Sequence, residues 1–113
     1  MSVEIFVSEN FKKEAKKYLK KFKSLKEDLN KLMEELEKNP KSGTMISENV
    51  YKVRLASKSK GKGKSGGARV IFYYEIVNDR IVLIYIYDKS EMENVKDGFV
   101  RTLLQPFINN KKK

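Results

Sequence analysis

Four lysines alternate with serine and glycine in one short segment of the 113-residue chain, and an arginine follows them. The four are Lys58, Lys60, Lys62 and Lys64. Arg69 comes next, at the start of an aromatic and β-branched run, and no acidic residue lies between Glu48 and Glu75. Crowded cations disfavour one another's charged form, so Lys60, Lys62 and Lys64 could reach a pKa suited to accepting a proton. A solvated loop kept soluble by lysine would show the same composition, and both interpretations stay open.

Aromatic side chains and further cations flank this segment. Lys52 and Arg54 precede it, and rings follow it at Phe72, Tyr73, Tyr74, Tyr85 and Tyr87. Successive strand residues point to opposite faces of a sheet, so at most one of Tyr73 and Tyr74 can line a site, and most rings in central strands belong to a core. Cations beside exposed rings suit single-stranded RNA, whose phosphates take the charge and whose bases stack on aromatic side chains.

Side chains of these types could also cut RNA without a metal ion. The 2′-hydroxyl attacks the adjacent phosphorus, which requires a proton acceptor, cations for the charge on the phosphoryl oxygens and a donor for the leaving 5′-oxygen. Histidine usually transfers these protons, but the sequence contains no histidine and no cysteine. Thiol nucleophiles, disulfides and the usual metal ligands are therefore excluded, and we expect neither a metal nor a cofactor.

The overall composition indicates one folded domain spanning residues 1–113. Hydrophobic residues make up 40% of the chain, and 25 Lys and Arg against 15 Asp and Glu give a net charge of +10. This excess favours a polyanionic partner. The N-terminus does not resemble a signal peptide, and no apolar run approaches the roughly 20 residues that span a bilayer. We therefore expect a cytoplasmic protein that does not contact a membrane.

Hydrophobic periodicity predicts the elements that must position these residues. It predicts strands at 3–7, 51–57, 68–77 and 80–88, and helices at 11–22, 25–36 and 92–104. The order is β-α-α-β-β-β-α, an α+β fold in which helices pack on one face of a mostly antiparallel sheet and leave the other face available.

Local signals set the expected boundaries. Ser24 with Glu27, and Ser90 with Glu93, have capping-box spacing at the starts of the last two helices. Asn39-Pro40 should end the middle helix, and Pro106 should bend or end the final one. Asn78-Asp79 predicts a two-residue hairpin turn.

Two stretches carry a family resemblance. VRLASKSKGKGKSGGARVIFYY, residues 53–74, and IYIYDKSEMENV, residues 84–95, resemble the RelE/ParE superfamily of bacterial type II toxins, most closely its HigB-like branch. The match covers nearly the whole chain and is most specific in its middle third. The resemblance implies a compact RNase-like fold that enters the ribosomal A site, cuts mRNA there and is held inactive by a cognate antitoxin.

The resemblance also implies roles for individual residues. Lys60, Lys62 and Lys64 take the general base and phosphate-binding roles, Arg69 stabilises the charge of the transition state, and Lys89 lies beside it. Tyr87 supplies a stacking ring or a proton donor. The expected RNA contacts are Lys52, Arg54, Lys58 and Tyr73.

The sequence departs from the best-studied RelE pattern at two positions. Ser90 stands where that pattern has a second arginine, and Lys96 stands where it has a stacking tyrosine. The general acid is therefore open. Two other functions also remain: a ParE-like protein that poisons DNA gyrase by binding, and an RNA-binding module without catalysis. The lysine segment and Arg69 favour the nuclease over the gyrase binder, which does not require them.

Overall fold

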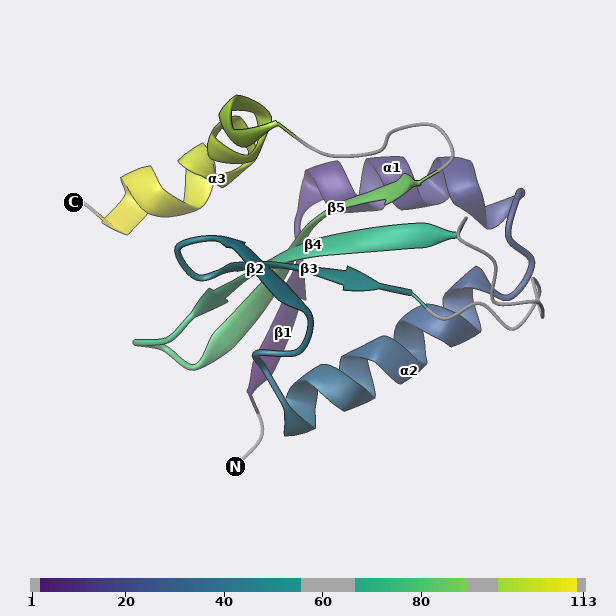
Figure 1. Cartoon of the computed structure of the whole chain (residues 1–113), viewed down its shortest axis with the longest axis horizontal. Helices are drawn as coiled ribbons and strands as arrows, with labels where there is room; N and C mark the ends of the chain where they lie inside the picture. Colours follow the sequence, from purple (N-terminus) through teal and green to yellow (C-terminus); the bar gives the residue numbers. More distant parts are fainter. Residues whose placement is uncertain (1–2, 56–66, 90–95, 112–113) are drawn as a thin grey trace.

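The computed structural model describes residues 3–55, 67–89 and 96–111, which form one sheet and three helices (Figure 1). In chain order the elements are β1 (Glu4–Val7), α1 (Glu9–Leu19), α2 (Leu25–Lys38), β2 (Thr44–Ser47), β3 (Val50–Arg54), β4 (Ala68–Glu75), β5 (Arg80–Asp88) and α3 (Asp97–Lys111). The strand order is β1-β5-β4-β3-β2, with β1 parallel to β5 and the other neighbours antiparallel. The predicted α+β fold with a mostly antiparallel sheet is confirmed.

The first two helices begin and end close to the predicted positions. Ser8 caps α1, and its hydroxyl accepts a hydrogen bond from the Phe11 N–H at 3.1 Å. Ser24 precedes α2 as predicted, but its hydroxyl donates to the Asp28 carboxylate at 2.7 Å and makes no capping bond. The capping bond expected from the Ser24 side chain is therefore absent, although the predicted helix start is confirmed. Asn39 ends α2 just before the proline.

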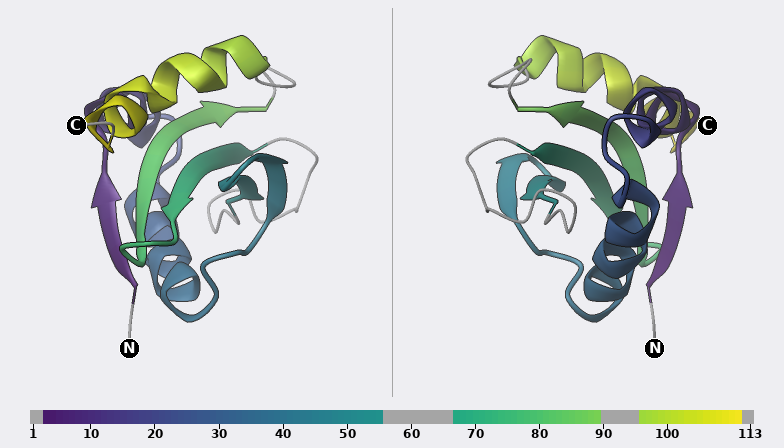
Figure 2. Two further views of the ribbon diagram at one scale, coloured as in Figure 1. Left: turned by 90° about the vertical axis from the view of Figure 1, so that its left-hand side faces the viewer. Right: turned by 90° about the vertical axis from the view of Figure 1, so that its right-hand side faces the viewer.

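The two central strands are buried on both faces. Val70 and Phe72 of β4 pack in a cluster with α1 and α2, whereas Ile71 and Tyr73 pack in a second cluster with α3. Figures 1 and 2 show α3 well apart from α2. The expectation that all helices share one face is therefore wrong, because α3 covers the other. The nearly continuous apolar run from Ile81 to Tyr87 is typical of a strand with both faces covered.

Differences from the predicted elements concentrate at the sheet edge and near the C-terminus. The edge strand β2 was not expected. The Ser90–Glu93 capping box lies outside the described residues, and α3 is described from Asp97. The final helix continues past Pro106 to Lys111, so it does not end at the proline. Buried Leu104 and half-buried Phe107 pack on either side of this position, which compensates for the lost backbone donor.

The predicted hairpin between the central strands is confirmed, with a longer loop than expected. Four residues connect Glu75 to Arg80, and the Asp79 N–H donates to the Ile76 carbonyl at 3.1 Å. Asp79 adopts a φ of 52°, in the left-handed region that aspartate tolerates better than most residues.

Among the described residues, no helix is both long enough and apolar enough to cross a membrane.

A bulge changes the register half-way along this hairpin. Phe72 pairs with Leu83, but Ile71 pairs with Tyr85, so Ile84 is an extra residue in β5. Ile84 and Tyr85 therefore both lie on the α3 side of the sheet. Beyond the bulge, Arg69 lies opposite Tyr87, whereas an uninterrupted ladder would place Ile86 there.

Candidate nucleic-acid interface

Three of the predicted site residues form a row across three neighbouring strands. Arg54 of β3 lies directly opposite Arg69 of β4, which in turn lies directly opposite Tyr87 of β5. Directly opposed residues project from the same face of a sheet, and here that face is the one carrying α3. Arg54 is exposed, Arg69 is half-buried and Tyr87 is buried. The row therefore runs from solvent toward the core, with two guanidinium groups at its open end.

Backbone hydrogen bonds fix the end of the sheet where this row lies. The Leu55 N–H donates to the Ala68 carbonyl at 3.0 Å, and the Lys89 N–H donates to the Gly67 carbonyl at 3.0 Å. Nη1 of Arg69 lies 3.5 Å from the same Gly67 oxygen. Gly67 has a φ of 101°, which a residue with a side chain rarely adopts. The ends of β3, β4 and β5 are thus bound together around Arg69.

Tyr87, the buried end of this row, also belongs to an aromatic group. Its ring stacks on Tyr85 with centroids 6.2 Å apart, and Tyr85 meets Phe99 of α3 edge to face at 5.0 Å. The Tyr87 hydroxyl is buried and has no hydrogen-bond partner among the described residues. Burial raises its pKa above the ordinary 10.0, and the nearby charge of Arg69 partly opposes that rise. The hydroxyl therefore stays protonated and neutral near pH 7.

Of the remaining predicted residues, only some lie near this row. Lys52 lies opposite Ile71, on the same face and two residues from Arg54 along β3. Lys89 directly follows β5 and is half-buried. Lys58, Lys60, Lys62, Lys64 and Ser90 lie outside the described residues. Lys96 is exposed, just before α3.

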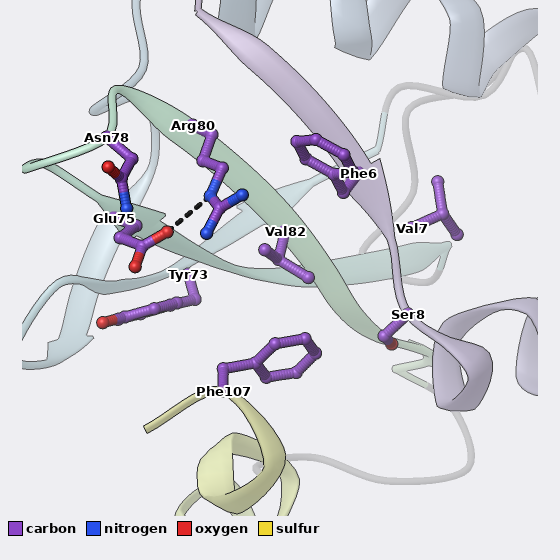
Figure 3. A pocket seen from close by; sticks show the side chains of 9 residues that line it. All are labelled: Phe6, Val7, Ser8, Tyr73, Glu75, Asn78, Arg80, Val82 and Phe107. Carbon is purple, nitrogen blue, oxygen red and sulfur yellow. Dashed lines mark hydrogen bonds and ion pairs between the residues drawn. The ribbon is translucent and has the colours of Figure 1, made fainter. Parts of the chain in front are cut away.

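Tyr73 lies elsewhere, in a pocket of about 520 Å³ toward the hairpin end of the same face (Figure 3). The pocket is lined by Phe6, Val7, Ser8, Tyr73, Glu75, Asn78, Arg80, Val82 and Phe107. Nε of Arg80 lies 2.5 Å from Oε1 of buried Glu75 and the guanidinium lies over the Phe6 ring. Three residues of β4 lie between Arg69 and Tyr73, so the structure does not join Tyr73 to the arginine row.

Sequence reasoning missed Glu75, Arg80 and Phe107 as members of this pocket. The first two could have been paired from the hairpin, since Glu75 and Arg80 are the first opposed residues after its loop. Phe107 carried no such signal because the helix was expected to bend or end at Pro106.

Comparisons with known proteins agree with this architecture. Residues 3–105 match the family model described as the RelE toxin of the RelE/RelB toxin–antitoxin system. The fold also resembles that of a double arginine-to-alanine mutant of the E. coli toxin RelE in the free state, with a TM-score of 0.58 and 18% identity over 82% of this chain and 90% of that one. The predicted superfamily is confirmed, and the HigB-like branch stays a prediction. The chain belongs to the RelE toxin family.

Proposed function

We propose that this toxin is a ribosome-dependent endoribonuclease that cuts mRNA in the A site and thereby inhibits translation. Family membership makes it the toxin of a toxin–antitoxin pair and implies an antitoxin partner of the RelB type. The observation that carries the nuclease proposal is the placement of Arg54 directly opposite Arg69. Two guanidinium groups that project from the same face of the sheet are suited to holding one phosphate between them through charge-assisted hydrogen bonds.

In this proposal the two arginines have different roles. Arg69 is half-buried and held by the frame around Gly67, so it is suited to stabilising the charge that develops on the phosphoryl oxygens. Arg54 is exposed and suited to holding a neighbouring phosphate. Lys52 extends the cationic track along β3, and Lys89 adds a charge at the end of β5.

The proton transfers are assigned to lysine. We keep Lys60, Lys62 and Lys64 as candidates for the general base, on the argument that neighbouring cations lower the pKa of a lysine. Tyr87 is less suited to contact the leaving oxygen because its hydroxyl is buried. We assign Tyr87 a supporting position directly opposite Arg69 on the neighbouring strand. Lys89, which directly follows β5 and is half-buried, then becomes the candidate for the proton donor.

The proposal is tested with purified toxin and ribosomes carrying a defined mRNA. New 5′ ends are mapped by primer extension, with the same mRNA free of ribosomes in a parallel reaction. We expect cuts at the A-site codon and little cutting of the free RNA. Equal cutting in both reactions would contradict the ribosome-dependent part. Intact mRNA with inhibited gyrase supercoiling would favour the ParE-like function, and ribosome binding without any cut would favour the non-catalytic module.

A further inference from the structure

A buried carboxylate lies at the end of β5, immediately behind the arginine row. Asp88 is 1% exposed, and its Oδ2 lies 2.6 Å from Nζ of Lys21. Tyr87 and Asp88 are consecutive strand residues, so the Asp88 side chain points away from the arginine face and toward α1 and α2. The Lys21–Asp88 ion pair thus links the helical side of the sheet to the end that carries Arg69.

The lysine of this pair is held in an ordered turn. Lys21 lies between α1 and α2, and its backbone N–H donates to the Tyr18 carbonyl at 3.1 Å. The next residue, Phe22, is buried and its N–H donates to the same carbonyl at 2.8 Å. The Lys21 ammonium also lies 5.7 Å from the centre of the Phe22 ring. The Lys21 side chain remains 46% exposed. The turn therefore places a partly hydrated cation against a carboxylate that is shielded from water.

Removing either partner therefore affects the end of the sheet. Removing the Lys21 ammonium would take away a cation 2.6 Å from a buried carboxylate, which is unfavourable, so we expect the strand end to shift toward water. Asp88 lies directly opposite Ala68, and its neighbours along the chain are Tyr87 and Lys89. The Lys89 N–H is bonded to the Gly67 carbonyl, two residues from Arg69. Movement of Asp88 would thus disturb the frame that holds the guanidinium.

From this arrangement we infer that Lys21 and Asp88 are positioning residues for the cleavage site. The ion pair holds the end of β5 against the start of β4, and so sets the place of Arg69 without touching RNA. The inference rests on the proposed nuclease function. It assigns the turn between α1 and α2, on the far side of the sheet, a part in setting the cleavage rate.

The test compares Lys21→Met, which keeps the aliphatic chain and removes the charge, with Lys23→Met, an exposed lysine of the same turn that serves as the matched control. Single-turnover cleavage on programmed ribosomes should fall about 10-fold or more in Lys21→Met, because small misplacements of catalytic groups are costly. Ribosome binding should change less than about 2-fold, since no contact with RNA is lost. Lys21→Arg should restore most of the rate, and Lys23→Met should match the wild type.

Coupling to Arg69 separates positioning from a general loss of stability. If Lys21 acts through Arg69, then adding Lys21→Met to Arg69→Ala should lower the remaining rate by less than about 2-fold. Independent, multiplicative losses in the double variant would overturn the inference. So would a rate loss in Lys21→Met that equals its loss of folded protein in a thermal melt.

Amide hydrogen exchange supplies a readout that does not depend on cleavage. Exchange at the Lys89 amide should accelerate in Lys21→Met and in Asp88→Asn, while amides within α2 remain protected. Unchanged exchange at Lys89 would overturn the inference even if the rate falls. If the wild type cuts no mRNA, the proposed function fails, yet faster exchange at Lys89 would still support the link between the turn and the sheet end.

Discussion

Arg54 and Arg69 lie directly opposite each other on neighbouring antiparallel strands. Two guanidinium groups that project from the same face are suited to binding one anion between them through charge-assisted hydrogen bonds. Inorganic phosphate should therefore raise the melting temperature of the wild type more than that of Arg54→Ala. Equal shifts in the two proteins would show that phosphate does not bind at this pair.

Arg54→Ala should weaken binding to programmed ribosomes in a way that depends on salt. If Arg54 holds one phosphate, its removal should reduce the slope of log affinity against log salt by roughly one. The cleavage rate of the bound complex should change little. Lys31→Ala, an exposed lysine of α2 on the opposite side of the sheet, is the matched control and should leave the slope unchanged.

Arg69→Ala should instead reduce the single-turnover cleavage rate by about 10² or more, the scale of a lost electrostatic stabiliser. Binding should fall far less, because Arg54 and Lys52 remain. Arg69→Lys should recover little, since a point charge does not reproduce the planar guanidinium fork. A proportional loss of binding and rate, or an unfolded Arg69→Ala, would make Arg69 a contact or a structural residue.

Tyr87→Phe should stabilise the protein. Its buried hydroxyl has no partner among the described residues, and removing an unsatisfied polar group should raise the free energy of unfolding by about 1 kcal/mol. Urea denaturation measures this change, and Tyr74→Phe is the contrasting variant, because its hydroxyl donates to Asp79 at 3.0 Å. A stability loss in Tyr87→Phe would mean that the hydroxyl is bonded within the folded protein.

Tyr87 should also make the free energy of unfolding depend on pH in the alkaline range. Burial raises the folded pKa of Tyr87 above the ordinary 10.0, so the unfolded chain loses this proton first as the pH rises. The free energy of unfolding should therefore fall above about pH 10, where the folded state binds more protons than the unfolded state. Stability measured from pH 8 to 11 should fall less steeply in Tyr87→Phe than in the wild type.

Association with the antitoxin should slow as salt rises. The toxin carries a net charge of +10, and an acidic segment of the partner is the simplest electrostatic match for the arginine row. Stopped-flow association at increasing ionic strength measures this dependence, because added salt screens long-range attraction. A rate independent of salt would contradict charge steering and leave inhibition itself unaffected.

The sequence could predict those helices and strands in which the spacing of apolar residues follows their burial. The stripes at 11–22 and 25–36 and the apolar runs of β4 and β5 made the helices and central strands predictable. The strand β2 has only four residues and is largely exposed, so no burial pattern marks it. The place of α3 depends on packing across the sheet, and only the lack of alternation in β5 hinted at a second covered face.

The sequence could predict which types of side chain form the candidate site, but only partly which of those side chains lie next to one another. The clustering of Arg54 and Arg69 along the chain suggested a cationic surface, and the strand pairing then made them direct neighbours. Tyr73 looked equally suitable, but its side chain lies in the pocket by the hairpin. Residue type indicates what a side chain can do, whereas register decides which side chains meet.

The bulge at Ile84 gives β5 two halves with opposite phases of alternation. A deletion of Ile84 would therefore remove the bulge and leave Tyr87 opposite Arg69. An insertion of one residue between Tyr85 and Tyr87 would instead leave the hairpin half intact but turn Asp88 toward the arginine face and Tyr87 toward α1 and α2. The site could thus be lost through a change in length alone, with every functional side chain still present in the sequence. Among natural variants, single-residue insertions should therefore be excluded between Tyr85 and Asp88, while the exposed hairpin loop at 76–79 tolerates them.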